Sequence, residues 1–147
     1  MKDSGKEYET YKGEIRTAKS SPNISCRCNL KCSTRLSSTQ QQRTFDEFYK
    51  LKSHDTQKYL YGLIKKVQIN RKRIRGSNRS VTYQYHVRLT AGIELRVCKK
   101  AFCEIHCIDR KRVDGLCKKL SASEIIVSDN RGKHTVHAIS DENREKV

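Results

Sequence analysis

Long hydrophobic runs are missing from this sequence of 147 residues. No stretch approaches the roughly 18 consecutive apolar residues that a membrane span requires, and the N-terminus lacks the apolar centre of a signal peptide. We therefore expect no membrane partner, and we expect the seven cysteines to lie in a reducing compartment. Their odd number and uneven spacing favour metal ligands and buried thiols over a disulfide framework.

Residues that build a hydrophobic core are also scarce. The chain has only 31 Leu, Ile, Val and Phe residues, close to the level below which charged chains stay unfolded. The sequence therefore predicts one modest domain whose core does not extend over the whole length. We place this basic, cysteine-containing domain at residues 26–120, a flexible polar tail at 1–25, and a linker with the start of a truncated helix at 121–147.

Acidic residues are too few to balance the basic ones. The chain has 32 Lys and Arg against 16 Asp and Glu, a formal net charge of +16. The excess is concentrated in residues 64–120, which hold 16 basic residues and four acids. Such a segment favours a polyanionic partner, most simply nucleic acid. A membrane-surface role is disfavoured because no basic amphipathic helix stands alone.

What the sequence does contain is a cluster of three cysteines, Cys26, Cys28 and Cys32. Closely spaced thiolates are typical of a structural zinc site, because a short loop can fold around Zn²⁺ without a core. We favour Cys98, at the end of a predicted strand, as the fourth ligand. The step from Cys26 to Cys28 is tighter than usual, so whether both bind one ion stays open. Alternative sources of the fourth ligand are Cys103 together with His106, and Cys107.

Two helices are predicted after this cluster. Ser37 or Ser38 can cap the first, with a glutamine three residues later completing a capping box. The aromatic residues that follow recur at helical spacing and share one face: Phe45, Phe48 and Tyr49. Asp55 can cap the second helix. Its predicted buried stripe consists of Tyr59, Leu60, Leu63 and Ile64.

From Val67 the hydrophobic period changes to two, which indicates strands. Residues 81–89 alternate clearly and 93–97 continue their apolar face, so we predict a three-stranded antiparallel sheet with one face on the helices and the other basic. The predicted basic face carries Thr82, Gln84, His86 and Arg88. A basic run before the turn at residues 76–78 can contact phosphates, act as a nuclear import signal, or both. The run consists of Arg71, Lys72, Arg73 and Arg75, and it leads us to expect a nuclear protein.

Residues 97–120 resemble a helix-turn-helix, whose second helix enters the DNA major groove. The apolar residues at helical spacing form two faces around a break, namely Phe102 with Ile105, and Val113 with Leu116 and Leu120. Asp109 is a suitable N-cap for the second helix. We expect its basic residues to contact DNA: Arg110, Lys111, Arg112, Lys118 and Lys119. The alternative is an ordinary helical hairpin with a solvated basic face.

Six short segments, in their order and spacing, resemble a known family. They are residues 28–32 (CNLKC), 45–49 (FDEFY), 83–85 (YQY), 97–102 (VCKKAF), 112–113 (RV) and 130–134 (NRGKH). They are similar to the N-terminal part of arthropod transposase-like proteins, and the resemblance covers roughly residues 5–147. It implies a DNA-binding, cysteine-containing front portion, followed in the family by a ribonuclease-H-type (DDE) catalytic domain. This sequence ends before such a domain would begin, and Cys26 is displaced from the family's first cysteine.

Together these features predict an α+β fold and a non-enzymatic, zinc-stabilised DNA-binding module. A nuclease or transposase needs two or three carboxylates around divalent metal, and the acids here are scattered. The alternative is an RNA-binding or protein-interaction module. An RNA reader would expose Tyr83 and Tyr85 for stacking on bases, yet both are predicted to face the core. The expected partner is duplex DNA, and a homodimer stays open.

Overall fold

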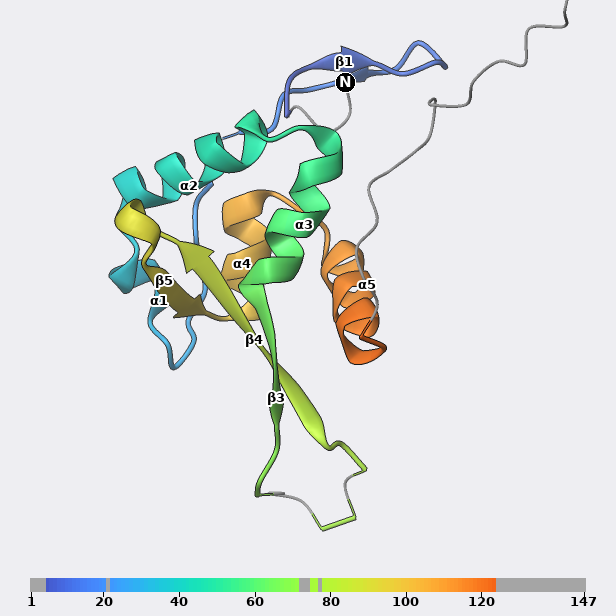
Figure 1. Ribbon diagram of the computed structural model, residues 1–147. Coiled ribbons are helices and arrows are strands. Elements are labelled where there is room, and N and C mark those ends of the chain that lie inside the picture. Colours follow the sequence, from blue (N-terminus) through green and yellow to red (C-terminus); the bar gives the residue numbers. More distant parts are fainter. Residues whose placement is uncertain (1–4, 21, 72–74, 77, 124–147) are drawn as a thin grey trace, which may run out of the picture.

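The computed structural model describes residues 5–20, 22–71, 75–76 and 78–123. It confirms the α+β fold: within these residues, five α-helices accompany a three-stranded and a two-stranded antiparallel sheet (Figure 1). No helix in this part of the chain is long and apolar enough to cross a membrane. Most of the linker and the helix start predicted at residues 121–147 lie outside the described residues. The helices are α1 (Cys32–Arg35), α2 (Ser38–Lys50), α3 (Ser53–Leu63), α4 (Lys99–His106) and α5 (Arg110–Ser121). The strands are β1 (Tyr8–Glu9), β2 (Ile15–Arg16), β3 (Ile64–Gln68), β4 (Val81–Arg88) and β5 (Glu94–Val97).

Helix α2 begins where its capping residues predict. Ser37 Oγ accepts a hydrogen bond from the Gln40 backbone N–H at 3.3 Å, and the Gln40 side chain accepts one from the Ser37 N–H at 3.1 Å. This capping box gives partners to N–H groups that the start of a helix leaves unpaired. The helix then buries Phe45 and Phe48, so the predicted aromatic face is confirmed.

The junction between α3 and β3 differs from the prediction. Lys52 is the N-cap of α3, and Asp55 lies in the first turn, where its charge suits the positive end of the helix dipole. Strand β3 begins directly after this helix at Ile64, before the predicted change of period at Val67. Ile64 is buried and pairs with Tyr85, so a side chain assigned to the helical stripe is buried by the sheet.

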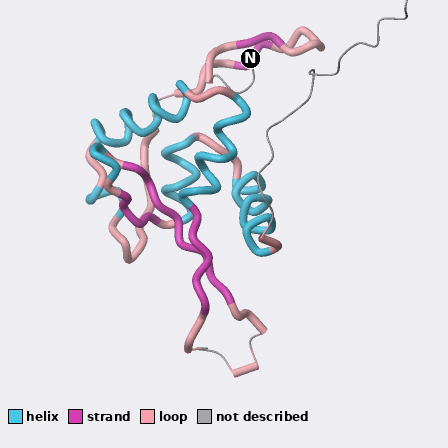
Figure 2. The backbone as a smooth tube through the Cα atoms, viewed as in Figure 1, coloured by secondary structure: helices cyan, strands magenta, loops and turns pink. Residues whose placement is uncertain are grey.

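The larger sheet has the order β3-β4-β5, with β4 in the centre. Residues 64–68 of β3 pair with 81–85 of β4, whereas β5 pairs with 85–88 at the other end of β4. The two pairings share only Tyr85, so most of the β3–β4 ladder has no third strand. This part of the hairpin therefore projects from the body of the molecule (Figures 1 and 2).

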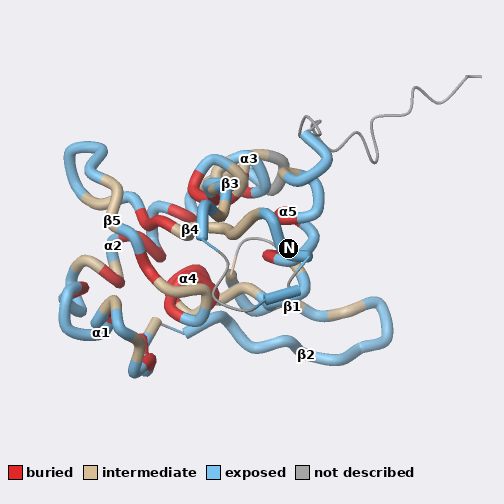
Figure 3. Tube along the Cα trace, turned by 90° about the horizontal axis from the view of Figure 1, so that it is seen from below, coloured by how far each residue is buried: buried red, intermediate tan, exposed pale blue. Residues whose placement is uncertain are grey.

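Helix α4 lies at the centre of the hydrophobic core. Its Ala101, Phe102 and Ile105 are fully buried, and it packs against α2 and β4. Helix α5 adds Val113 and Leu116 and packs against α3 and β3. The apolar faces predicted for this helical pair are therefore confirmed. Figure 3 shows buried positions concentrated around α4 and the facing parts of its neighbours.

Residues 8–16 form a short hairpin where the sequence predicted a flexible tail. Its stem packs on α2: the Lys19 N–H donates to the Gly5 carbonyl at 2.8 Å, and the Lys19 ammonium lies 5.2 Å from the centre of the Tyr49 ring. Gly5 has φ +68°, and a Cβ there would lie 2.9 Å from Tyr49 Cδ1, so glycine permits this close approach. The polar composition did not reveal the hairpin, because backbone groups and long polar side chains make these contacts.

Candidate functional site

Four cysteine sulfurs meet beside the start of helix α4. The Sγ atoms of Cys26, Cys28, Cys32 and Cys98 all lie within 4.8 Å of one another. Cys28 Sγ is 3.7 Å from Cys26 Sγ and 3.4 Å from Cys32 Sγ. Zinc binds thiolates at about 2.3 Å, which places the sulfurs of a tetrahedral site about 3.8 Å apart. The four predicted ligands are therefore brought together in an arrangement that can hold a metal ion such as zinc.

A tight turn explains how Cys26 and Cys28 reach the same centre despite their short separation. Lys31 adopts the left-handed conformation, with φ 49° and ψ 44°, and its N–H donates to the Cys28 carbonyl at 3.0 Å. Ser33 Oγ donates to the Cys26 carbonyl at 3.4 Å. These bonds turn the chain so that α1 starts at Cys32 beside the first two sulfurs. The short spacing is thus compatible with one shared centre.

Cys98 connects this loop to the helical pair. It is the N-cap of α4, where its Sγ accepts a hydrogen bond from the Ala101 N–H at 3.3 Å. Its own N–H donates to Cys32 Sγ, also at 3.3 Å. Such N–H donors stabilise the charged form of a sulfur ligand. A metal ion in this cluster would join the front loop to the first turn of α4.

Three of the four thiols, Cys28, Cys32 and Cys98, have pKa values shifted in different directions. The backbone hydrogen bond from Cys32 lowers the pKa of Cys28 to about 6. Burial raises the pKa of Cys32 to about 12, and burial also raises the pKa of Cys98. By itself, Cys28 therefore favours the thiolate, whereas Cys32 and Cys98 favour the protonated form, because burial disfavours their charged forms. A divalent cation reverses the preference and displaces the protons.

The alternative fourth ligands lie elsewhere. Cys107 Sγ donates to the Ser20 carbonyl at 3.6 Å. His106 is fully buried, with ring centres of Phe102 and Phe48 at 4.7 and 5.1 Å, and its Nδ1 lies 2.8 Å from the Phe102 carbonyl oxygen. Within the described part of the chain, the four-cysteine cluster is the one group of three or more metal-ligating side chains that are in reach of a common ion. Cys98 is therefore the fourth member, as predicted.

Helix α5 separates apolar and basic residues onto different faces. Asp109 caps its start by accepting the Lys111 N–H at 3.5 Å, as predicted. Its buried residues are Val113, Leu116 and Cys117. Four of the five basic residues predicted to contact DNA are exposed: Arg110, Lys111, Lys118 and Lys119.

The fifth basic residue of α5 has a different environment. Arg112 is half-buried, and its guanidinium donates to Thr56 Oγ1 on α3 at 3.0 Å. It therefore holds α5 against α3. Asp114, an acid on the exposed side of α5, forms an ion pair with Lys99 at the start of α4. The hydrogen bond from Lys99 holds the pKa of the Asp114 carboxyl below its usual value.

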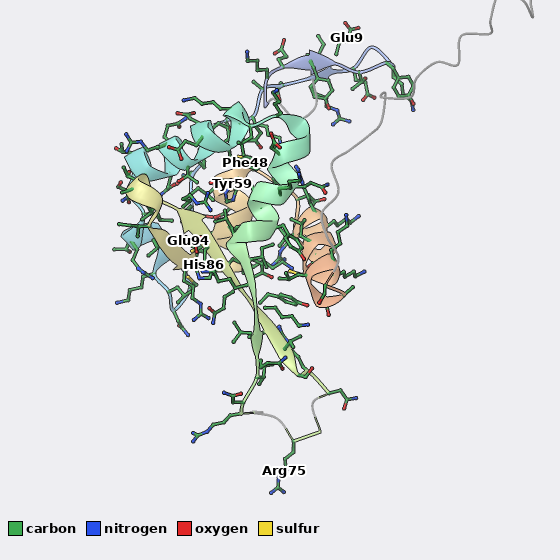
Figure 4. The ribbon with its side chains drawn as sticks, viewed as in Figure 1. Glu9, Phe48, Tyr59, Arg75, His86 and Glu94 are labelled. Atoms are coloured by element: carbon green, nitrogen blue, oxygen red, sulfur yellow. The ribbon has the colours of Figure 1, made fainter. Side chains whose placement is uncertain are left out.

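The β3–β4 hairpin provides a second basic surface. Arg71 and Arg75 are exposed, and Figure 4 shows Arg75 at the far end of the hairpin. Residues 72–73 of the predicted basic run lie outside the described residues. Lys66, which the sequence analysis did not single out, donates from Nζ to the Ser121 carbonyl at the end of α5, at 3.4 Å. The base of the hairpin therefore lies beside the end of α5. No local sequence signal marks Lys66 as the link, because the contact joins residues that are 55 positions apart.

The basic face predicted for the sheet is wrong at His86. This side chain is buried, and its Nδ1 lies 3.3 Å from the Leu63 carbonyl oxygen, because α3 packs against β4. Further along the sheet, Glu94 Oε2 is 2.7 Å from Lys65 Nζ, and Glu94 Oε1 is 3.9 Å from Arg88. The bond from Lys65 lowers the pKa of Glu94. This end of the sheet is therefore mixed in charge. Figure 4 labels Glu94 and His86 in this region.

The two strand tyrosines pack toward the core, as predicted. Tyr83 and Tyr85 are both partly buried against core residues. The Tyr85 ring centre lies 5.5 Å from that of Phe102, and its Oη lies 3.6 Å from Cys117 Sγ. The Tyr85 ring is therefore not freely available as a platform for stacking bases.

Comparison with known proteins gives no match: no protein-family model, no curated protein and no solved structure corresponds to this chain. What this protein does is therefore inferred from its cysteine cluster and its two basic surfaces.

Proposed function

We propose that this protein is a non-enzymatic, zinc-stabilised DNA-binding module that acts in the nucleus. In this proposal it is the DNA-binding portion of a transposase-like protein. The observation that carries the proposal is helix α5, which is anchored by Val113 and Leu116 and exposes four basic side chains on its other side. A helix buried on one face and basic on the other can enter the major groove of a duplex.

Zinc has a structural role in this proposal. A site closed by four thiolates leaves no open position for substrate, which is typical of structural zinc. The ion would be held by Cys26, Cys28, Cys32 and Cys98, and it would fix the first turn of α4 to the front loop. Since α5 follows α4 in the chain after three residues, the ion would also restrain the start of α5.

The two basic surfaces would make different contributions to DNA binding. Arg71 and Arg75 on the hairpin would supply affinity for phosphates that is independent of base sequence. Arg110 and Lys111, in the first turn of α5, would reach base edges, because the N-terminal residues of a recognition helix make such contacts. The Lys66–Ser121 hydrogen bond supports their action on one duplex, because it keeps the hairpin beside the helix.

The positions of the acids support a non-enzymatic role. Glu94 pairs with Lys65 and Asp114 pairs with Lys99. Glu104 accepts hydrogen bonds from the backbone and side chain of Ser25 at 3.1 Å. These carboxylates serve as partners in structural contacts, whereas metal-dependent cleavage needs carboxylates gathered on one ion.

A salt titration of binding to duplex DNA tests the proposal. We expect the affinity of the zinc-loaded protein to fall steeply with salt, and the log–log slope to decrease by roughly 0.9 for each phosphate contact removed. Lys118→Gln/Lys119→Gln should weaken binding and flatten the slope. The control Arg35→Gln/Lys50→Gln removes the same charge from exposed positions on α1 and α2, so its slope should stay close to that of the unmodified protein.

Two results would contradict the proposal. Equal effects of the two double variants would mean that overall charge, and not α5, determines binding. Stronger competition by single-stranded RNA than by duplex DNA would favour the RNA-binding alternative.

A further inference from the structure

A basic cavity of about 340 Å³ lies between the N-terminal hairpin and the start of α5. Ligand-binding cavities commonly measure about 300–1,000 Å³, so its size suits a small ligand or one group of a larger ligand. Four cationic side chains line it: Lys6, Arg16, Lys19 and Arg112. None of the first three belongs to the surfaces described above.

We propose that this cavity binds a phosphate group, belonging either to a nucleic-acid backbone or to a free phosphate compound. This inference goes beyond the proposed function, because the site is formed largely by a hairpin outside the DNA-binding surfaces. Lys and Arg are the side chains that bind phosphate oxygens most strongly.

Among the described residues of the lining, cationic side chains outnumber acidic ones. Asp109 is the one acid among them, and its carboxylate accepts the Lys111 N–H as the N-cap of α5. Arg16 has an ion pair with Glu14 at 3.5 Å, and both of these side chains are more than 60% exposed. A solvated pair of this kind contributes little, so an incoming phosphate can replace Glu14.

Two of the four cations already donate hydrogen bonds to groups of the protein. Lys19 Nζ donates to Tyr49 Oη at 2.9 Å and to the Cys107 carbonyl at 2.8 Å. Arg112 donates to Thr56 Oγ1 at 3.0 Å. Groups that are already fixed lose less conformational freedom when a ligand binds. Lys19 and Arg112 are therefore fixed before a ligand binds, and Lys6 and Arg16 add the other two cationic side chains.

Apolar groups complete the lining. Tyr8 and Ile108 are half-buried, and the backbone of Gly5 closes the stem against Tyr49. Partial exclusion of water strengthens the attraction between a phosphate and the cationic side chains. The cavity therefore forms only when the stem of the N-terminal hairpin is packed against Tyr49.

Calorimetric titration with inorganic pyrophosphate, using the zinc-loaded protein, is the first test. Lys6→Gln/Arg16→Gln should weaken binding by about tenfold or more, because a hydrogen bond to a charged group is worth roughly 1.5–3 kcal/mol. The control Lys12→Gln/Arg35→Gln removes the same charge from exposed residues outside the cavity lining. It should bind pyrophosphate as the unmodified protein does, and it also controls for interaction of pyrophosphate with zinc.

Duplex DNA is the second probe, and it separates the two sources of phosphate. If a backbone phosphate occupies the cavity, Lys6→Gln/Arg16→Gln should lower the salt slope by roughly 0.9 relative to the control. An unchanged DNA slope with weakened pyrophosphate binding would support a free phosphate compound. Equal pyrophosphate affinities and equal slopes in both double variants would overturn the proposal. The pyrophosphate result does not depend on DNA binding, so the two proposals can fail separately.

A glycine pair tests the requirement for hairpin docking. Gly5→Ala should reduce pyrophosphate affinity to the level of Lys6→Gln/Arg16→Gln, because its Cβ would collide with Tyr49. Gly92 also has a positive φ, +74°, but a Cβ there would meet nothing within 4 Å. Gly92→Ala therefore imposes similar backbone strain and should leave pyrophosphate binding intact. Unchanged binding in Gly5→Ala would count against the proposed cavity.

Discussion

At the scale of single residues, Cys98 has two structural roles at one position. Its Sγ accepts the Ala101 N–H at the start of α4, and the same atom lies in the four-sulfur cluster. Serine could keep the first role, because its hydroxyl also caps helices well. Serine cannot replace a thiolate as a zinc ligand. The substitution therefore separates the cap from the metal site.

We expect Cys98→Ser to lose bound zinc and several kcal/mol of folding stability, because metal binding contributes directly to folding in small metal-stabilised domains. Elemental analysis and denaturant unfolding measure the two effects. Cys107→Ser is the matched control, because Cys107 lies outside the cluster and is also half-buried. Full zinc content in Cys98→Ser would contradict the assignment of this ligand.

His106 gives a prediction about pH. Burial lowers its pKa to about 4, below the ordinary value of about 6.5 for histidine. Between these values the unfolded chain binds the proton and the folded chain does not. The contribution of His106 to the free energy of unfolding should therefore be constant above about pH 6.5 and decrease as the pH falls toward 4, by up to about 1.4 kcal/mol per pH unit.

Urea unfolding between pH 4.5 and 7.5 measures this effect, and His106→Asn isolates it. The asparagine amide can still donate to the Phe102 carbonyl but does not titrate. Loss of zinc in acid affects both proteins, so the difference between their pH profiles reports His106. Parallel profiles would show that the buried histidine does not contribute.

At the scale of elements, α5 contains a weak point at its centre. Gly115 lies in the middle of this helix and is exposed, and a Cβ there would meet nothing within 4 Å. We expect Gly115→Ala to raise the free energy of unfolding by about 0.5–1 kcal/mol, because alanine restricts the unfolded chain and suits a helix. Thermal or denaturant unfolding measures the change.

Two other glycines test the reason for this effect. Gly62 is also helical with open space around its Cβ position, so Gly62→Ala should stabilise in the same direction. Gly92 has a positive φ, so alanine there should destabilise. Equal effects at all three positions would show that backbone conformation does not determine the outcome.

At the scale of the whole molecule, the cysteine cluster connects distant parts of the chain. Residues 26–32 lie near the start of the chain, between β2 and the body of α1. Cys98 lies much later, between the last strand of the sheet and the helical pair. A metal ion would therefore restrain α4, and through it α5, although it touches neither basic surface. The proposed DNA-binding function should depend on an ion that is remote from the DNA.

Removing the metal tests this dependence. We expect a chelator to lower the hydrogen-exchange protection of the Ala101 N–H and to weaken DNA binding, and added zinc to restore both. Anisotropy with labelled duplex and exchange followed by mass spectrometry are the measurements. Cys98→Ser should show no recovery with zinc. DNA affinity that is unchanged without metal would separate the cluster from the function.

Local signals in the sequence determined much of the fold. The caps at Ser37 and Asp109, the alternation through residues 81–89 and the helical faces of residues 97–120 all act between near neighbours in the chain. They predicted the α+β class and most elements for that reason. The close spacing of Cys26, Cys28 and Cys32 is a signal of the same kind, and Cys98 was added from its place at a strand end.

Contacts between distant residues decided the rest. The start of β3 at Ile64, the burial of His86 and the inward direction of Arg112 depend on how α3 packs against the sheet and α5. The N-terminal hairpin and its basic cavity depend on the fit of Gly5 to Tyr49. The sequence by itself thus determined which groups are present and which local structures they favour. Only the tertiary structure decided which of them meet, because burial and charge pairing arise between elements.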